Sequence, residues 1–240
     1  MSSREGTTLG DVILQSPLAW LIAAVNLGVF VLAWMRDGSF GLDVDAQILL
    51  NLGASMRYFV QGGEYWRLAT AVFLHANWIH LLVNTVFMFR WCVEIEKTVG
   101  STRFAIAYLT TGTAGYAASV LCKSTMSVGA SGAGFGMIAV TLGILYRRMG
   151  SWDTFISNPF VRSTVSQAAF WILAGILLIR RMDNYAHVGG LVFGILCGLI
   201  VERRSVRRDL GWVLSWSAYL LVWAGIVVAA CVPGWGVTDR

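Results

Sequence analysis

The stretch Ser127-Val128-Gly129-Ala130-Ser131-Gly132-Ala133-Gly134-Phe135-Gly136 opens an apolar segment that continues to about Tyr146. The segment is predicted to be a helix, and its first turn carries one hydroxyl group, that of Ser131, among residues too small to cover it. Glycines on both sides of the serine allow another backbone to approach closely. Small residues are also common wherever two membrane helices pack, so this stretch alone does not distinguish a packing surface from a nucleophile.

The composition of the chain indicates a membrane protein. Hydrophobic residues make up 57% of the 240 residues, and charged residues make up 13%, about half the share found in a soluble domain. Apolar runs of about 18 residues or more recur, and these predict helices that cross a bilayer. The net charge of +5 is then explained by Lys and Arg in the loops, so no nucleic-acid partner is expected.

Seven apolar segments are predicted to span the membrane, which makes the expected fold an all-α polytopic membrane protein. No repeat or proline-rich linker divides them into domains. The connection over residues 36–67 is long and apolar, so a short amphipathic piece is expected there in the membrane interface. The seven segments are approximately Leu18–Met35, Leu68–Val93, Phe104–Leu121, Ser131–Tyr146, Thr164–Ile179, Ala186–Val201 and Leu210–Cys231.

The distribution of Lys and Arg predicts the orientation of the chain. With the N-terminus in the cytoplasm, eleven of the 18 basic residues lie on the inner side, and Arg203–Arg208 forms the strongest inner cluster. Residues 1–17 are polar and lack the features of a cleaved signal peptide, so they are expected to form a cytoplasmic segment. Residues 18–201 are expected to form a six-helix core. Residues 202–240 would supply an inner basic turn, a seventh helix and an outer tail.

Three predicted helices that run from outside to inside carry rare polar groups at one depth. Ser131 begins the fourth segment, His187 begins the sixth, and His80 and Asn84 lie one turn apart in the second. At 1.5 Å per residue, Ser131, His187 and His80 each lie about 22–24 Å above the inner charges of their own helix. Because the hydrocarbon core is about 30 Å thick, all three lie at one level near the outer surface. Burying ionisable groups in a membrane is costly, so these residues are candidates for a functional site.

Glycine ridges indicate that two of these helices pack closely. Gly190, Gly194 and Gly198 recur every four residues on the sixth segment, and Gly132 and Gly136 do so on the fourth. Close packing would allow a serine oxygen to come within about 3 Å of an imidazole nitrogen, as proton transfer requires.

Other interpretations of the polar residues are open. His187 could be a polar group that links helices, and His80 with Asn84 could lock two helices together. A metalloprotease site is disfavoured, because the chain has no HExxH motif and His75 and His80 lie about 140° apart around a helix. Four cysteines, namely Cys92, Cys122, Cys197 and Cys231, have no metal-binding spacing.

The same residues resemble the signatures of the rhomboid intramembrane serine proteases. Gly129-Ala130-Ser131-Gly132 resembles their GxSG nucleophile motif, and the run from His75 to Asn84 resembles their second-helix signature. Ala186-His187-Val188-Gly189-Gly190 is similar to their general-base helix, and Tyr65-Trp66-Arg67 matches the loop before the second span. The resemblance extends from about Gly62 to Gly198, and a seventh helix after the six-helix core occurs in part of the family.

The resemblance implies a serine endopeptidase with a Ser-His dyad. Ser131 would be the nucleophile and His187 its general base, while His80, Asn84 and the Ser131 backbone N–H would form the oxyanion hole. Asp183 is expected in the outer loop. Glu64 and Arg67 are expected to form a structural ion pair or backbone clamp. The residues expected to support the site are Gly129, Gly132, His75, Glu64 and Arg67.

The implied substrates are transmembrane segments of other membrane proteins, cut near the outer or luminal face, with no cofactor and no metal. The cell membrane is the expected location, and water must reach the site through a polar cavity open to the exterior. A non-catalytic rhomboid-like protein that binds membrane-protein clients is the alternative, against which the intact Ser131 and His187 count. A small transporter is disfavoured, because the inner halves of these helices lack a matching polar path.

Overall fold

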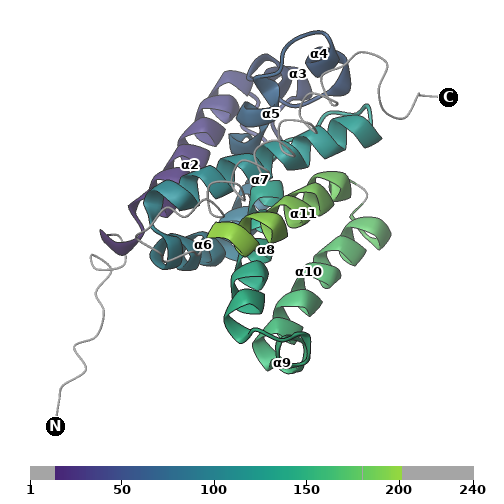
Figure 1. Cartoon of the computed structure of the whole chain (residues 1–240). Coiled ribbons are helices and arrows are strands. Elements are labelled where there is room, and N and C mark those ends of the chain that lie inside the picture. Colours follow the sequence, from purple (N-terminus) through teal and green to yellow (C-terminus); the bar gives the residue numbers. More distant parts are fainter. Residues whose placement is uncertain (1–13, 180, 202–240) are drawn as a thin grey trace.

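The computed structural model describes residues 14–179 and 181–201, and that part of the chain consists of helices and short connections (Figure 1). The predicted seventh span, Leu210–Cys231, and the basic turn Arg203–Arg208 lie outside the described residues. The helices are α2 (Pro17–Asp37), α3 (Ala46–Asn51), α4 (Arg57–Gln61), α5 (Arg67–Thr70), η1 (Ala71–Phe73), α6 (Trp78–Val99), α7 (Ser101–Cys122), α8 (Ser131–Met149), α9 (Trp152–Ser157), α10 (Pro159–Leu177) and α11 (Asn184–Val201).

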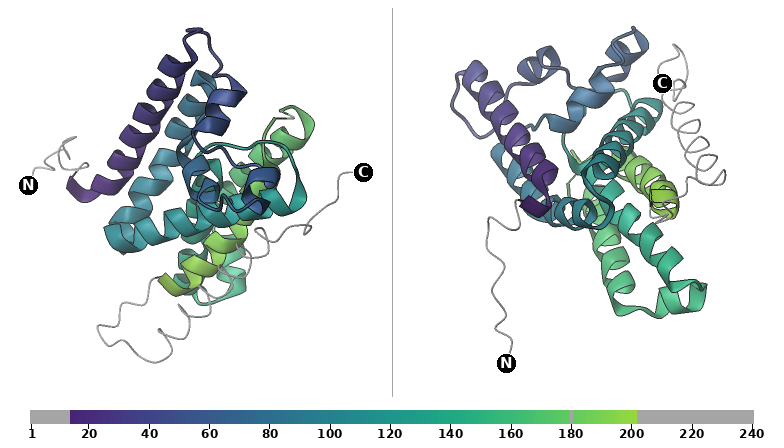
Figure 2. Two further views of the ribbon diagram at one scale, coloured as in Figure 1. Left: turned by 90° about the horizontal axis from the view of Figure 1, so that it is seen from above. Right: turned by 60° about the vertical axis from the view of Figure 1, so that its left-hand side comes forward.

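Five of the described helices are long and apolar enough to cross a membrane, namely α2, α6, α7, α10 and α11. The helix that begins at Ser131, α8, is not among them, since it is rich in glycine and ends with Arg147 and Arg148. Residues Gly132 to Val140 of α8 are buried, and α8 packs against α6, α7 and α11 (Figure 2). Because protein surrounds this helix over most of its length, its composition need not match that of lipid.

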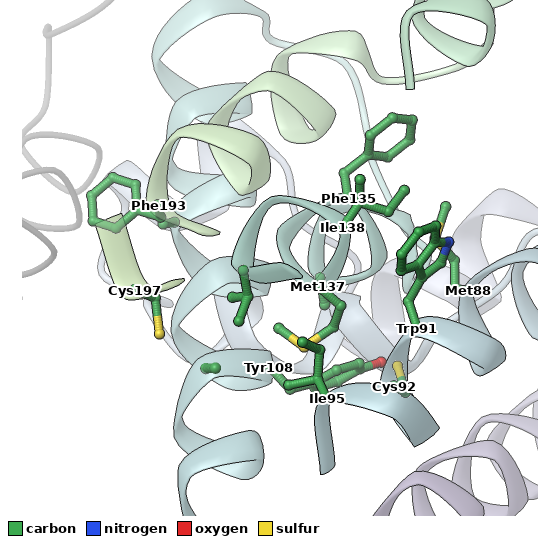
Figure 3. Close-up of a cluster of buried hydrophobic side chains, with 14 of the residues drawn as sticks. Met88, Trp91, Cys92, Ile95, Tyr108, Phe135, Met137, Ile138, Phe193 and Cys197 are labelled. Carbon is green, nitrogen blue, oxygen red and sulfur yellow. The ribbon is translucent and has the colours of Figure 1, made fainter. Parts of the chain in front are cut away.

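The hydrophobic core forms where α8 meets its three neighbours (Figure 3). Met137 and Ile138 of α8 are fully buried at its centre. Thioether, aromatic and aliphatic groups of different shapes fill this space, which holds the helices in one arrangement. The labelled side chains around them are Met88, Trp91, Cys92 and Ile95 of α6, Tyr108 of α7, Phe135 of α8, and Phe193 and Cys197 of α11.

The second span was predicted at Leu68–Val93, but the long helix α6 covers Trp78–Val99, so both predicted ends lie too early in the chain. Residues 67–73 form the short helices α5 and η1, and the long helix α6 starts only at Trp78. The start is set by Asn77, whose backbone is extended and whose side chain accepts a hydrogen bond from the backbone N–H of His80. Leu68 and Val72 are buried against the rest of the protein. Their apolar side chains therefore give this stretch the same hydropathy as a membrane span.

The connection between α2 and α6 contains short helices, as predicted, and Arg67 holds it together. The Arg67 guanidinium pairs with Glu64 at 2.9 Å and donates to the carbonyl oxygens of Leu50 and Ala54. The ring of Phe59 covers it at 4.4 Å. An ion pair or a backbone clamp was predicted here, and Arg67 makes contacts of both kinds.

A buried carboxylate joins the N-terminal end of α2 to the last turns of α6. The Glu96 side chain is 1% exposed and accepts hydrogen bonds from the backbone N–H groups of Leu18 and Ala19, and from the Ser101 hydroxyl. The first N–H groups of a helix have no partner inside the helix, so Glu96 caps α2 from another element.

Candidate active site

The backbone before α8 presents Ser131 at the N-terminus of that helix. Gly129 has a φ of +127°, in the region that only glycine adopts without strain. Its N–H donates to the carbonyl of Ala71, and its own carbonyl accepts from the Tyr116 hydroxyl at 2.6 Å. Ser55 and Ser127 pair through both backbone hydrogen bonds. These contacts fix the turn, and Ser131 is left only partly buried.

Close packing of α8 on α11 is confirmed at the predicted glycines. A Cβ placed on Gly190 would lie 2.0 Å from the carbonyl oxygen of Gly132, and one on Gly194 would lie 2.3 Å from that of Gly136. Neither position therefore has room for a methyl group. The backbones meet at van der Waals distance, which brings the first turns of the two helices together.

Ser131 and His187 are in hydrogen-bond contact. The distance between Ser131 Oγ and His187 Nε2 is 2.8 Å, and the imidazole is 2% exposed. The ring of Phe135 stacks on the imidazole with centroids 4.3 Å apart, which limits its rotation. The other ring nitrogen, Nδ1, lies 3.2 Å from Oδ1 of Asn184. Asn184 was not among the predicted site residues, although its position three residues before His187 places it on the same helix face.

Asp183 was expected in the outer loop, and it does precede α11, but it is mostly buried and makes several contacts. One oxygen accepts from the hydroxyls of Ser119 and Ser127 and pairs with Lys123 at 3.1 Å. The other accepts from the backbone N–H of Ala186 and caps α11. Burial acts to raise the pKa of Asp183, yet the Lys123 charge and these hydrogen bonds outweigh it and hold the pKa below its usual range.

His80 and Asn84 lie beside the turn that precedes Ser131. A Cβ on Gly129 would meet the His80 ring at 2.7 Å and the amide nitrogen of Asn84 at 3.4 Å. Asn84 is 5% exposed, and its amide N–H₂ has no hydrogen-bond partner among the described residues. An unpaired donor in a buried position is costly, so the Asn84 amide needs an explanation beyond packing.

His75 contacts His80 edge to face, with ring centroids 5.2 Å apart. It is 1% exposed, and neither ring nitrogen has a partner within the described part of the chain. Burial, helped by the neighbouring His80, lowers the pKa of His75 from 6.5 to about 3, so its ring is neutral. Glu64 and Arg67 act on the α2–α6 connection described above.

Two surface cavities lie along α6. One, of about 370 Å³, lies at the C-terminal halves of α6 and α8 and includes Arg90 and Arg148. The other, of about 490 Å³, is an apolar groove between α6 and α10, lined by Leu82, Val83, Val86, Phe87, Arg90, Trp91, Gln167 and Trp171. Neither is lined by Ser131 or His187, so the water cavity expected from the sequence stays a prediction.

Known proteins resemble this chain over its helical core. Residues 62–204 match the family model described as the Rhomboid domain. "RHOMBOID-like protein 4" of Arabidopsis thaliana is 32% identical over 67% of this chain and 39% of its own length. "Rhomboid-like protease 1" of Toxoplasma gondii is 28% identical over 91% of this chain and 75% of its own length. "Rhomboid protease GluP" of Bacillus subtilis (strain 168) is 29% identical over 73% of this chain and 33% of its own length.

The chain thus spans well under half the length of the Arabidopsis and Bacillus relatives and three quarters of the Toxoplasma one. The matched region contains all four motifs noted in the sequence and the contact between Ser131 and His187. With five helices long enough to cross a bilayer in its described part, the protein is an integral multi-pass membrane protein. More than half of its residues lie within the family match, and the chain therefore belongs to the rhomboid family.

Proposed function

We propose that the protein is a serine endopeptidase that cuts transmembrane segments of other membrane proteins near the outer face of the membrane. The observation that supports this most directly is the 2.8 Å contact between Ser131 Oγ and His187 Nε2. Serine is a weak nucleophile and needs a base at this distance. Two of the similar proteins are named as proteases, which agrees with this chemistry.

In the proposed reaction, Ser131 Oγ attacks the carbonyl carbon of the scissile peptide while His187 Nε2 takes the hydroxyl proton. The proton then passes to the leaving amine, and an acyl-enzyme remains. A water molecule, activated by the same imidazole, hydrolyses the ester and restores Ser131. The stacked Phe135 ring keeps the imidazole in line for both transfers.

The negative charge on the tetrahedral intermediate would be stabilised by Asn84, His80 and the Ser131 backbone N–H. The unpaired amide of Asn84 supports this role, since a buried donor without a partner is ready to bind an oxyanion. Gly129 supports it sterically, because a side chain there would occupy the space beside both donors. Gly132 and His75 would maintain the packing around the site, and Glu64 with Arg67 would hold the α2–α6 connection.

The substrate would reach the site from the lipid. The apolar groove between α6 and α10 exposes Leu82 and Val86, which can contact the side chains of a transmembrane helix. We further propose a cytoplasmic segment over residues 1–17, a six-helix catalytic core over 18–201, and a seventh span within 202–240. The C-terminus would then lie outside, and the cell membrane is the proposed location.

The test is cleavage of a panel of model transmembrane substrates by the purified protein in liposomes. Wild type should cleave at least one substrate, and Ser131→Ala and His187→Ala should each abolish cleavage without loss of the folded state. A fluorophosphonate probe should label wild type and leave Ser131→Ala unlabelled. If a folded wild type neither cleaves nor reacts with the probe, the chain is instead a non-catalytic binder of membrane proteins.

A further inference from the structure

We propose that Asn184 is a positioning residue for His187, and that the backbone of α10 sets the orientation of the Asn184 amide. This inference rests on the proposed function, because it concerns the base of the same reaction. It adds a third side chain to the Ser-His pair and links that pair to α10.

Ile172 of α10 fixes the orientation of the Asn184 amide. The amide nitrogen of Asn184 donates to the carbonyl oxygen of Ile172 at 3.0 Å. A carbonyl oxygen can only accept a hydrogen bond, so the amide must turn its N–H₂ group toward α10. The contact removes the ambiguity between oxygen and nitrogen that an asparagine side chain otherwise has.

The orientation of the amide then determines where His187 carries its proton. With the nitrogen facing Ile172, the amide oxygen of Asn184 faces His187 Nδ1 at 3.2 Å. That oxygen is also only an acceptor, so Nδ1 must be the protonated nitrogen of the neutral ring. His187 Nε2 is left with its lone pair free to accept the Ser131 proton at 2.8 Å. The opposite tautomer would point an N–H at Ser131 and could not act as its base.

Space for this arrangement comes from a glycine on α10. A Cβ on Gly175 would lie 2.7 Å from the amide oxygen and 2.8 Å from the amide nitrogen of Asn184. The Asn184 amide therefore fills the place that any side chain at position 175 would take. Because α10 packs much less extensively on α8 and α11 than those two helices pack on each other, this amide is an important link between α10 and the dyad.

The first experiment measures the tautomer directly. The chain contains three histidines, so ¹⁵N spectra of protein labelled only at histidine are simple, and a His187→Gln variant assigns the signal. In wild type at a pH where the ring is neutral, His187 should show a protonated Nδ1 and an unprotonated Nε2. In Asn184→Ala the signals should shift toward the other tautomer or a mixture. Asn184→Asp keeps an acceptor at Nδ1 and should retain the wild-type pattern.

The second experiment measures kinetics on a model transmembrane substrate in liposomes. Asn184→Ala should lower kcat by at least about 10- to 100-fold, the loss seen when the hydrogen-bond partner of a metal-bound histidine is removed. The KM should change little, because substrate binding does not use the amide. Asn184→Asp keeps the acceptor at Nδ1 but loses the donor to Ile172, so it should recover only part of the lost kcat. Gly175→Ala, which displaces the amide from α10 without altering Asn184 or His187, should lower kcat in the same direction.

Gly28→Ala is the matched control for the glycine variant. Gly28 lies on an exposed face of α2, and a Cβ there would have no heavy atom within 4 Å. The Gly28→Ala variant should therefore leave kcat and the His187 tautomer unchanged. Spectra of each variant establish that it is folded before its kinetics are compared.

The outcomes separate this inference from the proposed function. If folded wild type has no activity, the proposed function fails, while the histidine spectra still test the contact between Asn184 and His187. An unchanged His187 tautomer in folded Asn184→Ala would overturn the inference even if wild type is an active protease. So would a kcat within about twofold of wild type for both Asn184→Ala and Gly175→Ala.

Discussion

A single methyl group added at Gly190 should separate Ser131 from His187. A Cβ at this position would lie 2.0 Å from the carbonyl oxygen of Gly132, whereas ordinary contact begins at 3.4 Å. The obstacle is backbone of α8, which cannot rotate away as a side chain could. In Gly190→Ala, α11 must therefore move away from α8 by about 1.4 Å at this level.

His187 lies one turn before Gly190 and would move with α11. The distance between Ser131 Oγ and His187 Nε2 is 2.8 Å, so an added displacement of this size takes the pair beyond hydrogen-bond range. A misplacement of about 1 Å can cost roughly 10²-fold in rate, and we expect kcat to fall at least that far. The strained packing should also lower the free energy of unfolding by about 1–3 kcal/mol.

The assay is steady-state cleavage of a model transmembrane substrate in liposomes, with unfolding followed in parallel. Gly28→Ala serves again as the control, since it adds the same methyl group to a helix where it meets nothing. It should retain full activity. If Gly190→Ala is folded and its kcat stays within about threefold of wild type, the close contact of the two backbones does not hold the dyad together.

Three further variants test other parts of the structure. Asn84→Ala should lower kcat by about 10²–10³-fold without a matching change in KM, the usual cost of one oxyanion donor; an unchanged kcat would limit Asn84 to a structural role. Glu96→Ala should lower the free energy of unfolding by about 2–5 kcal/mol, because buried N–H groups of Leu18 and Ala19 lose their acceptor; equal stability in a detergent unfolding series would refute this. His75→Gln should weaken the loss of stability in acid. The pKa of His75 is lowered to about 3 by burial, so the unfolded chain binds more protons below pH 6.5, and wild type should lose about 2 kcal/mol between pH 7 and pH 5 through this residue.

The sequence predicted the long helices well where the apolar segment and the helix end at nearly the same residues. The predicted span Phe104–Leu121 lies within α7, and Ala186–Val201 lies within α11. The prediction failed at residues 68–77, because Leu68 and Val72 are apolar for burial inside the protein. Hydropathy alone does not separate burial against protein from burial in lipid. The cap at Asn77 was the signal that could have placed the start of α6 correctly.

The contact between Ser131 and His187 was also predictable, because two independent patterns converge on it. Rare polar groups at one depth indicate a shared site, and glycines spaced by four on both helices indicate close approach. The roles of these residues in catalysis stay predictions. Asn184 was not predictable in the same way, since its position depends on a carbonyl of α10 and on the space at Gly175. The spacing of residues along the sequence does not show which backbone carbonyl of another helix will accept a hydrogen bond, or where a glycine leaves space for a side chain.

Asp183 explains why an amide, and not a carboxylate, lies beside His187. The carboxylate is only four residues away, yet both of its oxygens are already used: one by Ser119, Ser127 and Lys123, the other by the backbone of Ala186. Through these contacts the Asp183 carboxylate links α7, the turn before α8 and the start of α11. A second carboxylate at position 184 would face the carbonyl of Ile172 and add a buried charge without a cation to pair with it. A neutral amide can satisfy both neighbours at once, donating to the carbonyl and accepting from the imidazole. The fold can thus orient His187 without burying a further charge beside it.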